Sequence, residues 1–389
     1  MHENLKRRVG EHIDEIQGEV IRTCRRIYEN PETGFREYRA SSILCGVLQE
    51  HGFDVELGIG DYETAFRATL PYSGEGPTVA LLAEYDALPE IGHGCGHNII
   101  AGATLAAALG LQAVSRDLPG RVTVIGTPGE EGGGGKILLM NNGVFDKVDA
   151  ALMVHPGDAT VLDESTLAVS KIEINFTGRP SHAASAPERG INALDAVIMT
   201  FNAVNAMRQQ IPSSARIHGI ITDGGAQPNI IPSHSAALFY VRSPETQEMS
   251  SLIDRLKACA EGAARATGAT VKFSEAEPAY EPVLTNRELA MCFGRNLSLL
   301  GMRIDGPTGR AVSTDMGNLS RKIPAIHPFV AICPRGTELH SLEFQTAAGS
   351  PEAMKVMIRS ALALAMTVID VITDRTLMQK IKSEMDNRK

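Results

Sequence analysis

Hydrophobic positions near the start of the chain follow a helical rhythm. Between residues 11 and 50 they recur at steps of three and four, at Ile13, Ile16, Val20, Cys24 and Ile27 and again at Ala40, Ile43, Leu44 and Val47. This spacing gathers them on one face of a helix. The intervening segment 30–34 (NPETG) has the composition of a turn. We therefore expect two amphipathic helices joined by a loop.

The next part of the chain alternates between strand-like and helical patterns. The strand-like runs are 64–70, 77–82, 121–126 and 150–154, with helical stretches at 101–114 and 136–142. A further strand is predicted at 325–332, and Ser350-Pro351 gives a long last helix a capping residue and a proline in its first turn. Alternation of this kind predicts an α/β fold with a mainly parallel sheet flanked by helices.

The pattern changes at about residue 171. A half-buried strand at 171–178, a helix at 191–210, two strands at 218–222 and 236–242, a helix at 247–267 and a strand at 270–273 follow in order. This β-α-β-β-α-β unit can bury both helices against one sheet. We predict an inserted α+β (ferredoxin-like) domain at 171–283 and a catalytic domain formed by 1–170 and 284–389.

Charge and composition exclude some classes of function. The net charge of −9, without any Lys- or Arg-rich run, disfavours nucleic-acid binding. We expect no membrane span, because we expect no apolar stretch to reach the roughly 20 residues required, and no signal peptide, because residues 1–16 are too polar. Six scattered cysteines in a chain this long indicate reduced thiols and a cytoplasmic protein.

Side chains able to bind metal or move protons stand where predicted strands end. The run VALLA (79–83) leads into Glu84-Tyr-Asp86, the run 122–126 leads into Glu130-Glu131, and 150–154 leads into His155. Ligands of open α/β sheets bind beyond the carboxyl ends of the strands. These side chains are therefore expected to converge on one crevice.

A glycine-rich segment, GHGCGHN (92–98), supplies Cys95 and His97. Thiolate and imidazole suit zinc or a similar transition metal. Glu131, His155 and the distant His340 raise the number of ligands to five, which suits two divalent ions that share a bridging ligand. One glutamate of the Glu130-Glu131 pair would bind metal and its neighbour would handle protons.

Each of these residues also has an ordinary structural explanation. A single histidine is more often structural than a ligand, glycine-rich segments make turns, an acidic pair is often solvated, and Asp86 could cap a loop. Their joint position at strand ends is what favours a metal site.

The motifs resemble those of the dinuclear metal amidohydrolases and peptidases, which include carboxypeptidase G, aminoacylase, succinyl-diaminopimelate desuccinylase and the plant auxin-conjugate hydrolases. The resemblance covers nearly the whole chain. It rests on EYDALP (84–89), GHGCGHN (92–98), TPGEEGGGG (127–135), GRPSH (178–182), GGAQPNIIP (224–232), STDMGN (313–318) and LHSLE (339–343). The CGH, EYDALP and STDMGN forms most resemble the aminobenzoyl-glutamate hydrolases and the dipeptidases acting on basic residues.

The resemblance implies a role for each site residue. The two ions, zinc or alternatively manganese or cobalt, would be bound by Cys95, His97, Glu131, His155 and His340. Glu130 would be the general base and Asp86 would orient a ligand. The inserted domain would be a lid that carries the contact of a homodimer, so that His182 stabilises the oxyanion in the partner's active site. Asn229 and Arg242 would hold the carboxylate of a small-molecule substrate.

One position departs from the family pattern. Many relatives have a metal-binding histidine where this chain has Glu84, and an aspartate that bridges the ions. Here Cys95 would complete the ligand set, and His97 or the Cys95 thiolate would form the bridge.

Two other functions remain open from the residues. Cys95 could be the nucleophile of a hydrolase that uses no metal, with His97 or His155 as its base. The chain could also be a catalytically silent binding protein on the same scaffold. The presence of Glu130 and of the full ligand set favours an enzyme that hydrolyses the amide bond of an N-acyl amino acid or a dipeptide.

Overall fold

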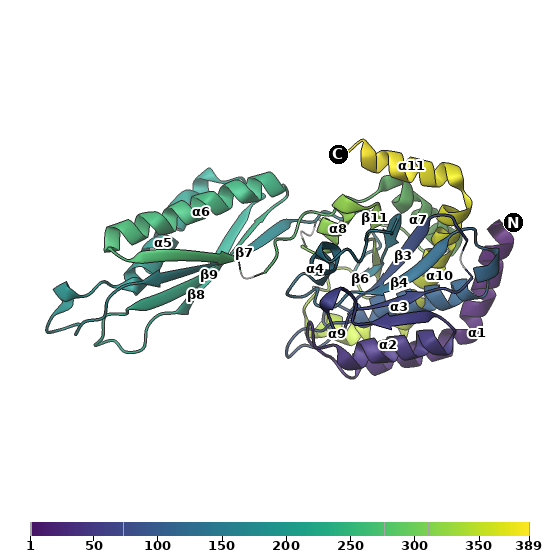
Figure 1. The fold of residues 1–389 in the computed structure, drawn as a ribbon, viewed down its shortest axis with the longest axis horizontal. Helices are drawn as coiled ribbons and strands as arrows, with labels where there is room; N and C mark the ends of the chain where they lie inside the picture. Colours follow the sequence, from purple (N-terminus) through teal and green to yellow (C-terminus); the bar gives the residue numbers. More distant parts are fainter. Residues whose placement is uncertain (1, 73, 276, 310–311, 389) are drawn as a thin grey trace. The chain divides into compact units, whose positions relative to one another are not determined.

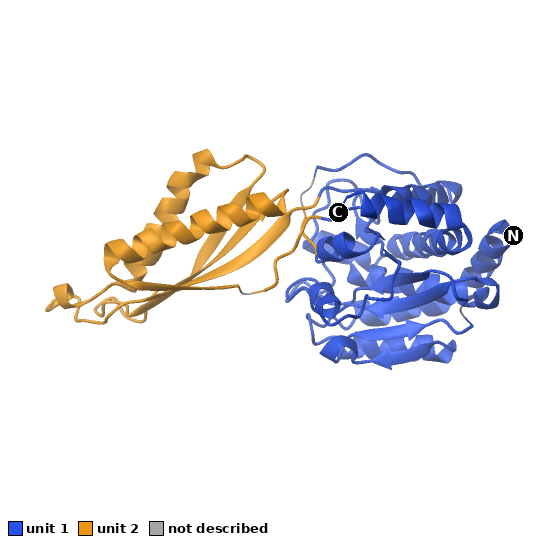
Figure 2. Cartoon of the chain, turned by 45° about the horizontal axis from the view of Figure 1, so that its top comes forward, with its two compact units in different colours: residues 1–165, 283–310, 315–389 blue, residues 166–282, 311–314 orange. Residues whose placement is uncertain are grey.

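The computed structural model describes residues 2–72, 74–275, 277–309 and 312–388 (Figure 1). The chain divides into two compact units (Figure 2). Unit 1 comprises Met1–Ser165, Val283–Arg310 and Asp315–Lys389, and unit 2 comprises Thr166–Pro282 and Ala311–Thr314. Unit 2 starts before the predicted boundary at 171, because its first strand begins at Ala168 and the N–H of Leu167 donates to the Val312 carbonyl at 2.8 Å.

Unit 1 contains a six-stranded sheet in the order β1-β2-β4-β3-β5-β11. The strands β3, β4, β5 and β11 are parallel, and β1 and β2 add an antiparallel edge. This arrangement confirms the predicted mainly parallel sheet. The bounds are β1 (Asp54–Leu57), β2 (Phe66–Thr69), β3 (Thr78–Ala83), β4 (Arg121–Gly126), β5 (Ala150–Leu152) and β11 (Ala325–Ile326).

The strand predicted at 325–332 is interrupted. It divides into β11 and β12 (Phe329–Ala331), and β12 pairs in parallel with β6 (His155–Gly157). Pro328 stands between the two segments and has no N–H to donate to a strand ladder. The break separates β6, and with it His155, from the main sheet.

Helices cover this sheet. Both predicted helices near the start of the chain form, as α1 (His2–Tyr28) and α2 (Tyr38–Glu50). Helix α3 (His97–Gln112) is buried along nearly its whole length, because α1 and α10 (Pro351–Thr373) both pack against it. The remaining helices are α4 (Gly135–Asn141), α7 (Arg287–Leu299), α8 (Met316–Lys322), α9 (Leu342–Ala348) and α11 (Arg375–Asp386).

The expectation that no segment is long and apolar enough to span a membrane was wrong. By length and hydropathy α10 would suffice, the one such helix in the described part of the chain. Its apolar window is 67% buried inside unit 1, where it packs against α1, α3 and α7. A helix buried to this extent has the position of a core helix, whose apolar residues are covered by other parts of the protein.

Unit 2 has the predicted β-α-β-β-α-β topology. Its antiparallel sheet has the order β10-β7-β9-β8, and both helices pack on one face of it (Figure 2). Alternate residues such as Ile172, Ile174 and Phe176 point into that helical layer. The bounds are β7 (Ala168–Thr177), α5 (Ala193–Met207), β8 (Arg216–Asp223), β9 (His234–Ser243), α6 (Thr246–Thr267) and β10 (Thr270–Glu275).

Four short 3₁₀ helices complete the described elements. They are η1 (Ile59–Asp61), η2 (Ser115–Asp117), η3 (Pro187–Arg189) and η4 (Arg208–Gln210).

Candidate metal centre

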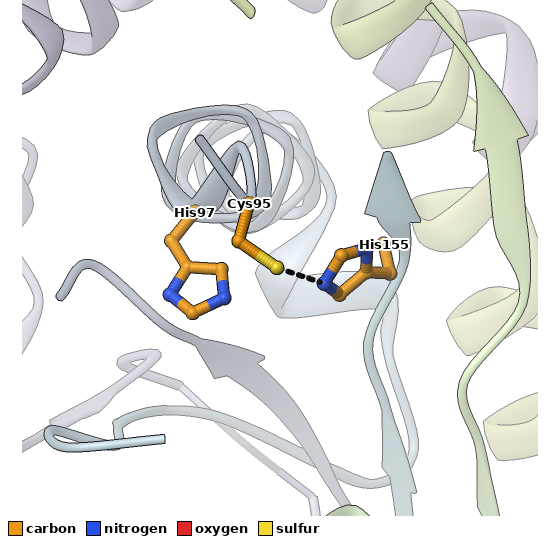
Figure 3. A group of neighbouring side chains, drawn as sticks. All are labelled: Cys95, His97 and His155. Carbon is orange, nitrogen blue, oxygen red and sulfur yellow. Dashed lines mark hydrogen bonds between the residues drawn. The ribbon is translucent and has the colours of Figure 1, made fainter. Parts of the chain in front are cut away.

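Cys95, His97 and His155 come together within unit 1 (Figure 3). His97 is the first residue of α3, Cys95 lies just before it, and His155 opens β6. The Cys95 Sγ lies 3.6 Å from His155 Nε2. Ligand atoms of all three residues lie within 4.8 Å of one another. The start of a buried helix and the first residue of a short strand thus supply one ligand group.

Two further groups share members with the first. Cys95, Glu131 and His340 form one, and His97, Glu130 and Glu131 form the other. His340 Nε2 lies 3.4 Å from Glu131 Oε1, and the histidine has a positive φ of 62°. Its N–H donates to the Gly94 carbonyl at 2.9 Å, which ties this distant segment to the Cys95 loop. All five predicted metal-binding residues therefore lie in one cluster of unit 1.

Asp86 fixes the orientation of His97. Its Oδ1 lies 3.0 Å from His97 Nδ1, and its Oδ2 accepts a hydrogen bond of 3.0 Å from the N–H of Glu131. The Asp86 and His97 side chains are both fully buried. With Nδ1 bound to a carboxylate, the imidazole presents Nε2 to the cluster, as metal-binding histidines commonly do.

Buried atoms in the cluster lack hydrogen-bond partners among the described residues. They include His97 Nε2, Glu131 Oε1 and Glu84 Oε2. From His97 Nε2 it is 3.6 Å to Glu84 Oε2, 3.8 Å to Glu131 Oε1 and 4.0 Å to Glu130 Oε2. A buried polar atom left unpaired costs about 1–3 kcal/mol. A cation fits this arrangement, since it would satisfy several such atoms at once, and the thiolate, imidazole and carboxylate set suits zinc or a similar ion.

Burial shifts the pKa values of His155 and Cys95. It lowers the pKa of His155 to about 4, so the ring is neutral. Because His155 Nδ1 lies 2.7 Å from the Pro156 carbonyl, Nδ1 carries the proton and the Nε2 lone pair is available to a metal. Burial also raises the pKa of the Cys95 thiol, and nearby Glu131 raises it further. A bound cation would reverse that effect and favour the thiolate.

The Glu130 carboxylate has a high affinity for protons. Burial raises its pKa well above the ordinary value, and the charge of Glu84 is the next cause. A glutamate tuned in this direction is a stronger base once it is ionised. Its position beside Glu131, at the loop after β4, places that base next to the candidate ligands.

The other three predicted site residues belong to unit 2. His182 is exposed, and its Nδ1 lies 3.2 Å from the N–H groups of Ala184 and Ser185. With Nδ1 accepting, the neutral ring carries its proton on Nε2, the form that donates to an oxyanion. The carbonyl of Asn229 accepts from Ala183 at 3.0 Å.

Arg242, the last of the three, lies on β9. Its guanidinium donates to Ser313 Oγ at 3.0 Å and lies 5.8 Å from the centre of the Tyr240 ring. A guanidinium can bind a carboxylate through two parallel hydrogen bonds.

Sequence reasoning assigned no role to several charged residues near the site. Lys136, Asp315 and Glu37 are fully buried. Lys136 binds Glu84 and Asp315, and Glu37 binds the loop that carries Glu130. A signal existed for Lys136, which follows the four glycines after Glu131 and begins an apolar helical run. No sequence pattern indicated that Lys136 would contact Glu84 and Asp315, which are 52 and 179 residues away. Nor did any pattern indicate the contact between Glu37 and Gly129, which are 92 residues apart.

The thiol, imidazole and carboxylate groups that gather beside the parallel sheet are of the kinds found in metal-dependent hydrolases. The chain belongs to the peptidase family M20/M25/M40, whose family model matches residues 80–366. This family is metal-dependent, and the chain is an enzyme that hydrolyses dipeptide or acyl-amino acid amide bonds. The resemblance predicted from the motifs is confirmed.

Individual relatives agree with this assignment. The chain is 39% identical to the Xaa-Arg dipeptidase of Mus musculus, over 98% of this chain and 92% of the relative. It is 31% identical to a chain of the p-aminobenzoyl-glutamate hydrolase of Escherichia coli, over 92% of this chain and 90% of the relative. The fold matches a dinuclear metal binding peptidase of Bacillus subtilis with a TM-score of 0.70 at 20% identity, covering 92% of this chain and 100% of that one.

Proposed function

We propose that the enzyme cleaves a dipeptide with a basic residue, or an N-acyl amino acid such as aminobenzoyl-glutamate, with two divalent ions. The ions would be zinc, with manganese or cobalt as alternatives. The ligands are Cys95, His97, Glu131, His155 and His340. The observation that carries this proposal is the meeting of all five in unit 1, where His97 Nε2 and Glu131 Oε1 are buried without hydrogen-bond partners among the described residues.

The bound ions would acidify water and polarise the scissile carbonyl. Glu130 accepts a proton from the attacking water and delivers it to the leaving nitrogen. Asp86 keeps His97 in the tautomer that presents Nε2. His182 donates a hydrogen bond from its Nε2–H group to the developing oxyanion, an interaction typically worth about 3–4 kcal/mol. Asn229 and Arg242 bind the substrate carboxylate.

We further propose a homodimer formed through the inserted domain, unit 2, in which His182 serves the active site of the partner subunit. The proposed location is the cytoplasm, which is supported by six cysteines that are all free in the described structure. We propose neither a nucleic-acid partner nor a membrane partner. The net charge of −9 supports the first point, and the burial of α10 supports the second.

A hydrolase that uses Cys95 as nucleophile is the second candidate, because the thiol lies 3.6 Å from His155 Nε2. Burial disfavours this pair, since it raises the pKa of the thiol and lowers the pKa of the imidazole that would accept its proton. This candidate also leaves Glu131 and His340 without a role. A silent binding protein fits poorly with the hydrolases to which the chain is related.

Metal removal separates these candidates. We expect a chelator alone to abolish turnover, and zinc, manganese or cobalt to restore it with close to two ions bound per chain. The assay should test dipeptides with a basic residue, aminobenzoyl-glutamate and a series of N-acyl amino acids. Full turnover by protein shown by elemental analysis to be metal-free would refute the metal mechanism and favour the thiol.

A further inference from the structure

A buried charged triad lies directly behind the candidate metal centre. Lys136 Nζ forms an ion pair with Glu84 Oε1 and a second with Asp315 Oδ1 at 2.8 Å. The N–H of Lys136 also donates to Asp315 Oδ2 at 2.8 Å. The side chains of all three residues are completely shielded from solvent. The triad joins the end of β3 to the first turn of α4 and the start of α8.

The two oxygens of Glu84 have different surroundings. Oε1 is bound to Lys136, whereas Oε2 has no hydrogen-bond partner among the described residues. Oε2 lies 3.6 Å from His97 Nε2, which likewise has no hydrogen-bond partner among the described residues. Lys136 thus holds one side of the carboxylate and leaves the other side facing a candidate metal ligand.

Charge balance supports a cation at Oε2. The triad has two carboxylates and one ammonium, and therefore a net charge of −1 in a region without solvent. An uncompensated buried charge is strongly unfavourable. A metal ion facing Glu84 Oε2 would place a positive charge on the side of the carboxylate that Lys136 leaves open.

We propose that Glu84 is a further metal ligand of this enzyme, and that Lys136 and Asp315 are positioning residues that aim its Oε2 at the ion bound by His97. The inference rests on the metal centre of the proposed function. It changes the expectation that this position contributes no ligand: in place of the family's histidine, the chain has a carboxylate held by an internal cation.

A purely structural triad is the competing explanation, and two isosteric variants separate it from ligation. Glu84→Gln and Asp315→Asn each remove one negative charge from the contacts of Lys136. Only Glu84→Gln alters an atom that faces His97. The measurements are zinc stoichiometry and dissociation constants by calorimetry, and the visible spectrum of the cobalt-loaded protein, all made beside thermal melts of each variant.

We expect Glu84→Gln to raise the dissociation constant of one ion by more than about 100-fold and to change the cobalt spectrum. Asp315→Asn should stay within the roughly 10–100-fold loss that follows removal of a residue supporting a ligand, with an unchanged cobalt spectrum. Parallel losses of affinity in the two variants, or no loss in either, would overturn the proposal.

Glu84→Asp covers the case in which Glu84→Gln does not fold. It keeps the charge that Lys136 needs but draws the carboxylate back by one methylene, so ligation predicts a folded protein with weakened binding of one ion. Wild-type affinity in this variant would overturn the proposal. The wild type separates this inference from the proposed function: if it binds no ion, the metal centre itself fails. If it binds two ions while the Glu84 variants bind as tightly, only the role of Glu84 fails.

Discussion

Glu37 accepts a hydrogen bond of 2.9 Å from the backbone N–H of Gly129, the residue before the proposed base Glu130. The same carboxylate oxygen accepts from the N–H of Phe35 at 2.9 Å, and the other oxygen accepts from the Thr64 hydroxyl at 2.9 Å. The Phe35 ring lies so close to Gly129 that a Cβ there would approach the ring to 2.6 Å. Glu37 and its loop therefore shape the segment that carries the base.

Replacing Glu37 should impair turnover more than substrate binding. Glu37→Ala leaves the buried N–H of Gly129 unpaired, at a cost of about 1–3 kcal/mol, and frees the loop to move. We expect kcat to fall by roughly 10–100-fold with little change in KM. Steady-state kinetics on the metal-loaded enzyme measures both constants.

Two variants control this experiment. Glu37→Gln keeps an oxygen for the N–H of Gly129 and an amide for Thr64, so it should recover most of the lost kcat. Glu63→Gln changes an exposed glutamate close by and should behave as wild type. If the Gln and Ala variants at position 37 lose turnover equally, Glu37 does not act through this hydrogen bond.

Glu37 should also make stability depend on pH. Burial raises its pKa from 4.5 to about 7, and the charge of Asp86 adds to this effect. The folded state therefore keeps a proton that the unfolded chain releases, and stability falls as pH rises from about 4.5 to about 7. Relative to wild type, Glu37→Gln should become more stable by about 2–3 kcal/mol between pH 5 and pH 8.

Urea unfolding of both metal-free proteins across this pH range measures the difference. Metal-free protein is required because metal affinity itself varies with pH. Titrations common to the two proteins cancel in the comparison. A constant difference between the two proteins would mean that Glu37 titrates as an ordinary exposed glutamate.

Glu130→Gln tests the assignment of the base. The amide keeps the size of the side chain but cannot take up a proton, so we expect turnover to fall by about 10²–10⁴-fold. The metal content should stay at the wild-type level, because Glu131 remains. Elemental analysis and single-turnover assays on the same preparation check both expectations. Near-normal turnover would remove Glu130 from the role of base.

The spacing of hydrophobic residues predicted most of the helices and strands, because the side chains that each element buries recur with the period of that element. Strand β7 alternates between buried and half-buried residues, and α1 buries one apolar face. The proximity of the proposed metal ligands was predicted for a related reason: strand ends of a parallel sheet share one edge. Local pattern could not locate β1, whose four residues are mostly exposed, or the break at Pro328.

The buried charges were beyond local pattern. A charged residue in the sequence is expected at the surface, and only its partners explain its burial. Lys136 is satisfied by Glu84 and Asp315, which come from distant segments. Glu37 is satisfied in part by Gly129, 92 residues away. These contacts join segments that are distant in the sequence, so they can be identified only from the three-dimensional structure.

Arg242→Ala tests the proposed anchor for the substrate carboxylate. We expect kcat/KM to fall by about 10–100-fold for a substrate with a free carboxylate, since a charge-assisted hydrogen bond contributes roughly 1.5–3 kcal/mol. The amide-capped analogue should lose much less. Arg216→Ala is the matched control, because Arg216 pairs with Arg242 across β8 and β9 but is exposed. Equal losses for both substrates would mean that Arg242 stabilises unit 2 and does not bind the substrate carboxylate.

Two Gly→Ala variants should have opposite effects on stability. A Cβ at Gly135 would lie 1.7 Å from the carbonyl oxygen of Pro128, so the loop carrying Glu130 must shift; we expect a loss of about 1–3 kcal/mol and reduced turnover. Gly262 lies in the exposed part of α6 with no atom within 4 Å of its Cβ position. There alanine should add about 0.5–1 kcal/mol through helix propensity. Denaturant unfolding of both variants measures the two effects, and a Gly135→Ala enzyme with wild-type stability would show that the loop is looser than its close contact with Pro128 implies.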